Sequence, residues 1–281
     1  MSLLGRIAEC NAHDLGRFLP FYIGERRMGW IKRPFAARLA DFPDVFTVGA
    51  AAVALAPGLD DFASRSAAVA GALRRLAEDG LVPGWRDEMY PVTPRFGAPP
   101  LMQMERAAVP LFGIRAWGVH VNGFLRKGEA IAMWIARRAA DKPTFPGMLD
   151  NFVAGGQPIG LGVMENVIKE CGEEAGVPPA LAAQARPVGA ISYRRETADG
   201  LKPDVQFVFD LELPPDFEPH PTDGEIDEFM LWPSAKVMTV TAETNEFKFN
   251  CNLVNIDFLV RHGLIGPDDP DYLEIVAGLH R

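Results

Sequence analysis

Three glutamates on one predicted helix are the side chains in this sequence best suited to do chemistry. Glu170, Glu173 and Glu174 stand three and four residues apart, a spacing that places them on one helical face. Like charges held this close destabilise a bare helix, and Glu174 falls at the edge of the apolar face, where an unpaired carboxylate is costly. A divalent cation would resolve both conflicts, because Mg²⁺ and Mn²⁺ take oxygen ligands and bridge to phosphate oxygens. Taken alone, the motif is also typical of a solvated acidic helix face.

The helix that must hold these glutamates follows a glycine-rich loop at 154–162 and ends at Ala175, before Gly176. At about 100° of rotation per residue, its apolar side chains fall within one arc of roughly 140°. This arrangement predicts a face buried against a core. The apolar side chains concerned are Val163, Met164, Val167, Ile168, Cys171 and Ala175.

The segment 155–177 resembles the Nudix box, G-x5-E-x7-R-E-U-x-E-E-x-G-U, in which U is aliphatic. It departs from the box at Leu161, where the box has glutamate, and at Lys169, where it has arginine. Lysine keeps the positive charge but loses the planar fork that holds a carboxylate by two bonds. Glu165 is no obvious substitute for the missing acid, because it lies about 140° around the helix from Glu170.

Four further strings extend the resemblance to one Nudix branch, which is fused to thiamine pyrophosphokinase in fungi and stands alone in plants and bacteria. In that branch a domain of unassigned role precedes the Nudix domain. The resemblance implies an α/β/α sandwich with a mixed sheet at 114–281, preceded by a smaller α+β domain at 1–113. The strings are WGVHVNGF, WIARRAADKPTFPGMLDNFVAGG, DGEIDEF and FKFNCNLVNIDFLVRHG.

The resemblance also implies an activity, namely Mg²⁺-dependent (or Mn²⁺-dependent) hydrolysis of a diphosphate linkage. In this branch the substrate is thiamine diphosphate or its oxidised analogues, which are cleaved to the monophosphate. The implied metal ligands are Glu170, Glu174, Glu173 (directly or through water) and the backbone carbonyl of Ala154, with Glu173 and Glu174 also catalytic. Lys169 would orient Glu170 without binding the metal itself.

Outside the box, the acidic run PTDGEIDEF contains Asp223, Asp227, Glu228 and the residue that we choose as the extra base, Glu225. A solvated acidic turn is the alternative for this run. We expect Arg137, Arg138 and Lys142 to contact phosphate, although each of them alone is more often an ordinary surface charge. The glycines Gly155 and Gly156 would allow close approach to the helix and to the phosphates. Among the aromatic residues, Trp117, Trp134 and Phe145 could stack on a heteroaromatic ring or belong to the core, and His120 is interpreted as structural.

Three alternative functions are compatible with the same motif. The same chemistry could act on ADP-ribose, NADH or another dinucleotide, because the box handles the phosphates and not the attached group. A Nudix fold that binds without hydrolysis is the second, with Leu161 and Lys169 in its favour and the three retained glutamates against it. An isomerase acting on prenyl diphosphates is the third, but it needs a cysteine and glutamate pair, whereas Cys171 points into the helix core and Cys251 begins a C-terminal helix.

Composition bounds the remaining possibilities. The 281 residues suggest about two domains, and a hydrophobic content of 48% excludes a disordered chain. A net charge of −9 removes the broad attraction to nucleic acid or anionic membranes, so we expect a small-molecule diphosphate partner and neither of those. Three scattered cysteines and no apparent signal peptide predict a cytoplasmic protein. Homodimer formation stays open, and so does the role of the first 113 residues.

Short elements of both kinds are predicted along the chain. The first domain should hold helices over 3–13 and 60–78, an apolar run at 18–23 and a strand over 45–55, and its boundary lies near Gly113, after five prolines between Pro91 and Pro110. The second should hold a hairpin over 115–140, strands over 186–195, 205–213 and 229–232, and helices over 250–261 and 270–277.

Overall fold

The computed structural model of the chain describes residues 2–142 and 144–280. The chain is described in two parts, called the first half (up to residue 113) and the second half (from residue 114). The first half contains a four-stranded sheet in the order β2-β1-β4-β3, built from β1 (Phe18–Ile23), β2 (Arg26–Lys32), β3 (Phe46–Val48) and β4 (Val53–Leu55). The helices of this half are α2 (Arg33–Leu39), α3 (Phe62–Glu78) and α4 (Val109–Phe112), and its second hairpin joins β5 (Met89–Val92) to β6 (Met102–Glu105). Short 3₁₀ turns cover Leu15–Arg17 and Arg106–Ala108.

The predicted single strand over 45–55 is wrong. Two strands, β3 and β4, pair antiparallel there, and the Gly49 N–H donates to the Ala52 carbonyl at 2.9 Å across the turn that joins them. The run of Val, Gly and Ala is apolar throughout, so its hydrophobicity gave no sign of the reversal. The prolines of 91–110 do prevent a long helix, and the chain forms the β5–β6 hairpin and the four-residue α4 instead.

The second half is built on a mixed sheet in the order β11-β14-β7-β8-β15, with β10 paired to β7 and β9 to β8. Its strands are β7 (Trp117–Lys127), β8 (Ala130–Arg138), β9 (Leu149–Asp150), β10 (Val153–Gly156), β11 (Arg186–Ser192), β14 (Val205–Glu212) and β15 (Ile226–Pro233). Only β14 and β7 pair parallel among the strands of this sheet that the structure describes. A small hairpin joins β12 (Arg195–Glu196) to β13 (Leu201–Lys202).

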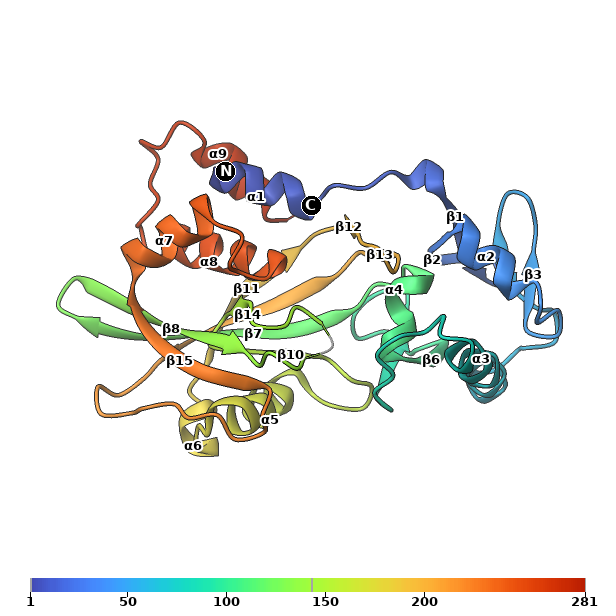
Figure 1. The fold of residues 1–281 in the computed structure, drawn as a ribbon, viewed down its shortest axis with the longest axis horizontal. Helices are drawn as coiled ribbons and strands as arrows, with labels where there is room; N and C mark the ends of the chain where they lie inside the picture. Colours follow the sequence, from blue (N-terminus) through green and yellow to red (C-terminus); the bar gives the residue numbers. More distant parts are fainter. Residues whose placement is uncertain (1, 143, 281) are drawn as a thin grey trace.

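Helices cover both faces of this sheet (Figure 1). One face carries α5 (Val163–Ala175) and α6 (Pro179–Ala182), and the other carries α7 (Ser234–Glu243) and α8 (Phe249–Arg261). Alternation along β7 divides its side chains between the layers, because successive residues of a strand point to opposite faces. Val119 and Val121 pack with α5, whereas Phe124 packs with α8. The expected α/β/α sandwich with a mixed sheet, preceded by an α+β unit, is confirmed.

The first helix, α1 (Leu3–Cys10), does not pack with the sheet of the first half. Ile7 and Cys10 share a core with Leu253 of α8 and Ile275 of α9 (Tyr272–Gly278), and Figure 1 shows α1 beside α9. The division at residue 113 stays a prediction; at that point Gly113 ends α4 in the left-handed conformation, with φ +57°. The sequence analysis did not predict α7, and within 2–142 and 144–280 no helix is long and apolar enough to cross a membrane.

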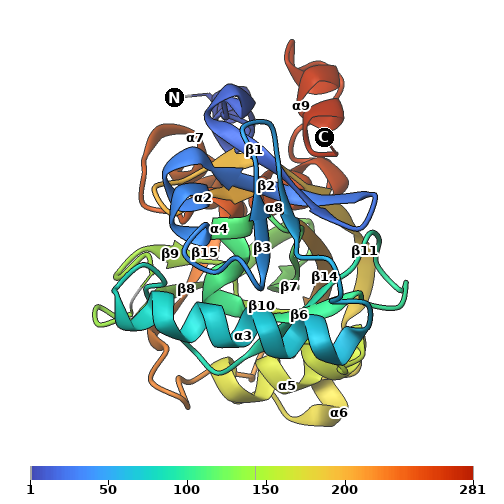
Figure 2. The ribbon, with the colours of Figure 1, turned by 90° about the vertical axis from the view of Figure 1, so that its right-hand side faces the viewer.

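Figure 2 shows how the two halves meet. α3 runs across the front of the molecule, and α5 lies below it. The β5–β6 hairpin of the first half reaches the glycine-rich loop of the second, where the Ile159 N–H donates to the Met89 carbonyl at 3.0 Å. The loop that leads into α5 is therefore held by both halves.

Candidate functional site

α5 holds its glutamates in place because the face beside them is apolar and buried. Val167, Cys171 and Ala175 recur at intervals of four and are fully buried, as the sequence predicts. The Gly162 N–H at the start of the helix donates to the Glu165 carboxylate at 2.8 Å. Glu165 thus caps the helix, and Gly176 ends it with φ +64°.

Glu174 is the most enclosed of the three glutamates, with 5% of its surface exposed. Its Oε2 accepts a hydrogen bond from the Ala154 N–H at 2.9 Å, which ties α5 to the end of β10. Burial raises the pKa of Glu174 well above its usual value, the Ala154 N–H opposes this, and the carboxylates of Asp150, Glu170 and Glu225 add to it. Several carboxylates therefore converge on one buried position.

Glu170 lies directly against Gly155. A Cβ added to Gly155 would stand 2.3 Å from Cδ of Glu170 and 2.5 Å from its Oε1, so the glycine is required by the helix and not only by a ligand. Lys169 is 3.4 Å from Glu170 Oε1 but only 2.5 Å from Glu173 Oε2. It therefore holds the exposed Glu173 more closely than the Glu170 that it was expected to orient.

A divalent cation fits this donor set. The three carboxylates and Ala154 are oxygen donors of the kind that Mg²⁺ and Mn²⁺ take. Among the described residues no lysine or arginine forms a salt bridge with Glu174, although the carboxylates around it need positive charge. The residues present thus suit a metal ion, which would be held by Glu170, Glu173 and Glu174.

A second cluster of potential ligands does not suit one. His120, Asp150 and Cys251 place one ligand atom each within 4.8 Å of one another, all of them buried. However, Arg138 and Lys248 each lie 2.9 Å from Asp150 Oδ2, and the Cys251 thiol donates to Oδ1 at 2.7 Å. The carboxylate is already neutralised by two cations, so this cluster is a structural ion pair network.

A cavity of about 430 Å³ lies between the two halves, beside the glutamates. Its floor includes Ala154 and the first two residues of the box segment, Gly155 and Gly156. The α5 glutamates stand just behind this floor, since Glu170 touches Gly155 and Glu174 bonds to Ala154. Glu225 also lines the cavity, so the box and the acidic run PTDGEIDEF do meet.

Lys142 holds Glu225 in place by an ion pair. Burial alone would raise the pKa of Glu225, but Lys142 and then Arg86 and Arg106 lower it below its usual value. A carboxylate that is ionised and aimed into the cavity can accept a proton. Asp227 and Glu228 of the same run are exposed and do not line the cavity.

The two arginines expected at phosphate are occupied by protein groups. Arg137 bonds Glu228 at 2.7 Å and the Gly147 carbonyl at 3.2 Å, and it is absent from the cavity wall. Arg138 lines the cavity, yet its guanidinium bonds Asp150 and the carbonyls of two neighbouring loop residues, Thr144 and Phe145. Both guanidinium groups are therefore bonded to other parts of the protein, where they stabilise the fold.

The lining of the cavity includes aromatic and acidic residues. Trp117 and Phe145 belong to the lining, whereas Trp134 packs with the α5 core. Tyr193 donates its hydroxyl to Asp204 Oδ2 at 3.2 Å, and both residues face the cavity. Burial raises the pKa of Asp204, and Lys202, 4.0 Å away, opposes the shift.

His120 reaches the same cavity from β7, and its ring is fully engaged. Nδ1 lies 2.8 Å from Asn151 Oδ1 and Nε2 lies 3.3 Å from Asn250 Nδ2, which suits a neutral ring. Burial, and then the Lys248 ammonium, lower the pKa of His120 to about 4. The structural role assigned to His120 fits this network.

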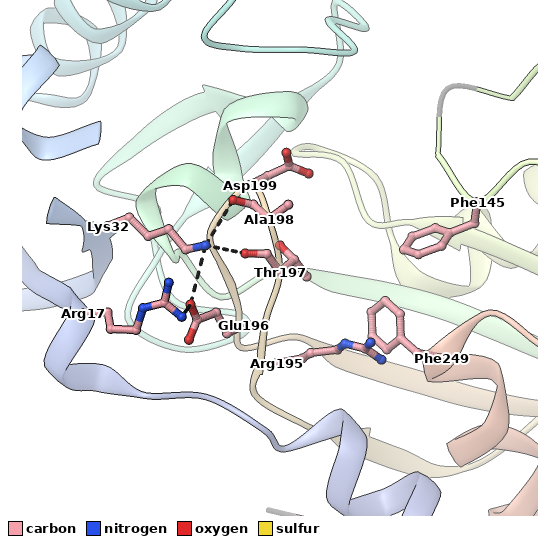
Figure 3. Close-up of a pocket in the computed structure, with 9 residues that line it drawn as sticks. All are labelled: Arg17, Lys32, Phe145, Arg195, Glu196, Thr197, Ala198, Asp199 and Phe249. Atoms are coloured by element: carbon pink, nitrogen blue, oxygen red, sulfur yellow. Dashed lines mark hydrogen bonds and ion pairs between the residues drawn. The ribbon is translucent and has the colours of Figure 1, made fainter. Parts of the chain in front are cut away.

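An adjoining cavity of about 660 Å³ shares Phe145 and Phe249 with the first (Figure 3). Lys32 donates to the Thr197 carbonyl at 2.6 Å and so fastens the β12–β13 turn to the first half. Arg195 lies over the Phe249 ring at 4.3 Å. The polar groups of this second cavity mostly pair with one another.

Sequence analysis missed Arg86, Tyr90, Arg106, Asp204 and Gln206, all of which line the first cavity. None stands in a motif, and the first three precede the box by about 50 residues or more. Their one shared signal, a charged or polar side chain beside an apolar strand, is common on any protein surface.

Comparisons with known proteins match both the first part of the chain and nearly its whole length. Residues 2–116 match a family described as a domain of unknown function (DUF4743). Over 280 residues the chain is 45% identical to Nudix hydrolase 24, chloroplastic, of Arabidopsis thaliana, and this match covers 98% of the chain and 77% of that protein. Nudix hydrolase 20, chloroplastic, of the same plant is 43% identical over 285 residues, with 98% and 76% covered. Both names contradict the predicted cytoplasmic location.

A solved structure is similar over part of the chain. It is the NUDIX domain of Shewanella oneidensis NrtR complexed with ADP ribose, at 14% sequence identity and a TM-score of 0.41. The match covers 55% of this chain and 91% of that one.

Proposed function

This chain belongs to the Nudix hydrolase family, and on that basis we propose that it hydrolyses a diphosphate linkage with a divalent metal, Mg²⁺ or Mn²⁺. The observation that carries the proposal is the convergence of Glu170 and Glu174 on the floor of the cavity, formed by Ala154 and Gly155. A buried carboxylate cluster without a paired lysine or arginine at its centre is where a metal ion is bound most favourably.

The bound metal would neutralise phosphate charge and lower the pKa of a water. The chain's own groups do the remaining work. Glu225, kept ionised by Lys142, accepts the proton of the attacking water. Gly155 and Gly156 present backbone without side chains, so the phosphates can lie against the floor. Lys169 holds Glu173 toward the same helix face.

For the substrate we propose thiamine diphosphate or its oxidised analogues, cleaved to the monophosphate. Support comes from the lining of the cavity, which includes Trp117, Phe145 and the buried Asp204. Aromatic faces and a carboxylate together favour a heteroaromatic ring that carries positive charge. The strings shared with the thiamine branch point to the same class.

Two alternatives keep specific support. ADP-ribose, NADH or a related dinucleotide would use the same metal site, and the cavity volume of about 430 Å³ admits part of such a molecule. A module that binds without hydrolysis is favoured by Leu161 and Lys169 but opposed by all three retained glutamates.

A substrate panel separates these possibilities. Phosphate and monophosphate release should be measured with thiamine diphosphate, oxothiamine diphosphate, oxythiamine diphosphate, ADP-ribose and NADH, in Mg²⁺ and then in EDTA. Metal-dependent cleavage concentrated on the thiamine compounds supports the proposed substrate. Preference for ADP-ribose or NADH overturns the substrate and keeps the chemistry, and no cleavage of any compound overturns hydrolysis.

A further inference from the structure

The cavity is not made by the Nudix half alone. Residues 2–116, which match a domain of unknown function, form one wall of it with Arg86, Tyr90 and Arg106. The opposite wall is the box loop and the strand that carries Trp117. The two walls belong to different cores, so the space between them exists only when both halves are assembled.

Tyr90 fixes the distance between the walls. A Cβ on Gly156 would lie 1.4 Å from the Tyr90 hydroxyl oxygen and 3.5 Å from Cζ of Arg106. The tyrosine is 5% exposed, and the Met89 carbonyl beside it accepts the Ile159 N–H at 3.0 Å. The hairpin of the first half is thus seated on the loop of the box, with no room for a side chain at Gly156.

Arg106 stands above this contact and is held in one orientation. Its Nη1 lies 2.6 Å from Glu88 Oε2, and its guanidinium carbon lies 5.6 Å from the centre of the Tyr90 ring. Among the described residues, the Arg106 side chain forms a hydrogen bond only with Glu88, and 38% of the Arg106 side chain is exposed. Nε and Nη2 therefore keep donors for a ligand.

The surroundings of the two arginines show what that ligand carries. Arg86 and Arg106 line the same cavity as Glu225 and the floor of Ala154, Gly155 and Gly156. Cζ of Arg106 lies 3.5 Å from the position of a Cβ on Gly156, and Glu170 touches the neighbouring Gly155. Six basic and three acidic side chains line the cavity, although the whole chain has a net charge of −9. An anion is favoured here, and the planar guanidinium suits phosphate oxygens.

Most of the other cations of the cavity are already used. Arg138 and Lys248 bind Asp150, and Lys142 binds Glu225. Lys202 is 4.0 Å from Asp204. Arg86 and Arg106 of the first half remain, and the ion pair with Glu88 uses only Nη1 of Arg106.

We propose that residues 2–116 form the substrate-binding half of the active site, in which Arg86 and Arg106 bind the phosphates of the diphosphate substrate. The inference rests on the proposed hydrolysis, since it names the groups that hold the substrate of that reaction. It gives the domain of unknown function a role in substrate binding, which it can perform only together with the second half. Dimer formation through this domain would be a separate property.

The variants that test this are Arg86→Gln, Arg106→Gln and Arg106→Lys. Arg106→Gln is combined with Glu88→Gln, so that no carboxylate loses its partner. Arg74→Gln is the matched control, because Arg74 is an exposed arginine of the same domain on α3 and does not line the cavity. Thermal unfolding of every variant shows whether the fold is kept.

Binding is measured first, by calorimetry with inorganic pyrophosphate in EDTA, which reports the arginines without the metal. Loss of a charge-assisted hydrogen bond to phosphate weakens binding about tenfold to hundredfold. We expect that change for the arginine variants, a smaller one for Arg106→Lys, and none for Arg74→Gln. Pyrophosphate affinity that is equal in the parent, Arg86→Gln and Arg106→Gln, or undetectable in the parent, overturns the inference.

Turnover separates this inference from the proposed function. With Mg²⁺ and thiamine diphosphate, the arginine variants should raise KM at least tenfold. If the parent binds pyrophosphate through these arginines but hydrolyses no compound of the panel, the hydrolytic function fails and the binding role stands. If the parent turns over and the arginine variants match Arg74→Gln in KM and kcat, the binding role fails and the hydrolytic function stands.

Discussion

Gly155→Ala tests whether the position of Glu170 controls the reaction. The backbone at Gly155 is ordinary for any residue, so the substitution adds a methyl group and nothing else. That methyl would stand 2.3 Å from Glu170 Cδ and 2.5 Å from its Cγ and Oε1. Non-bonded carbon atoms prefer about 3.5–4.0 Å, so the carboxylate must move by about 1 Å or more.

The cost of this movement falls on activity and not on stability. Glu170 ends in a flexible carboxylate with 14% of its side chain exposed, and leaving its preferred rotamer costs about 0.5–1.5 kcal/mol. A displacement of about 1 Å in a catalytic group lowers the rate about 100-fold. This corresponds to about 2.7 kcal/mol of activation free energy. We therefore expect a large loss of kcat in a folded protein.

The assay compares kcat, measured as monophosphate release in saturating Mg²⁺, with the free energy of unfolding in urea. Gly172→Ala is the control on the same helix, because a Cβ there meets nothing closer than the Val177 carbonyl at 3.9 Å. Alanine in a helix interior is more stabilising than glycine by about 0.5–1 kcal/mol. The control should keep full activity and gain stability.

A double-mutant cycle with Glu170→Gln shows whether the methyl acts through Glu170. If it does, the double variant Gly155→Ala, Glu170→Gln has the rate of Glu170→Gln alone, because a displaced ligand cannot be lost twice. Full activity of Gly155→Ala, or losses that multiply in the double variant, would refute the assignment of Glu170 to the metal.

Three further substitutions have distinct expected outcomes. Glu174→Gln should lower kcat at least about 100-fold with an unchanged unfolding midpoint, since the amide oxygen still accepts the Ala154 N–H; an undiminished rate in Mg²⁺ contradicts the metal site. Gly156→Ala should cost about 1–3 kcal/mol in urea unfolding, because its methyl meets the buried Tyr90 hydroxyl at 1.4 Å; parental stability would mean that the two halves do not meet there. His120 has a pKa of about 4 in the fold, against about 6.5 unfolded, so the unfolded chain binds the extra proton and stability falls as pH drops from 6.5 to 4. Between pH 7 and pH 5 this loss amounts to about 2 kcal/mol, and His120→Gln should remove it. A variant whose free energy of unfolding in urea falls between pH 7 and pH 5 as much as the parent's contradicts a buried neutral ring.

The chemistry-bearing helix was predictable because its information is local. The four-residue spacing of Val167, Cys171 and Ala175 sets which face is buried, and that alone places Glu170 and Glu174 along one edge of this face. Gly176 ends the helix by its conformation. No distant contact is needed for any of these features.

Partnerships of charged residues were not predictable in the same way. Arg137 and Arg138 have the composition of a phosphate site, but the folded chain places Glu228 and Asp150 next to them. Those carboxylates come from other strands of the sheet, whose register decides which side chains meet. The residues adjacent to the arginines in the sequence do not determine that register.

The sequence by itself thus determined the family, the sandwich and the glutamate face, since a motif and its helical period are properties of adjacent residues. Only the tertiary structure decided that Tyr90 packs against Gly156 and that Arg106 and Glu225 line the same cavity. The physical reason is that these groups lie far apart along the chain. Their meeting depends on how two separately packed cores dock, which no local periodicity encodes.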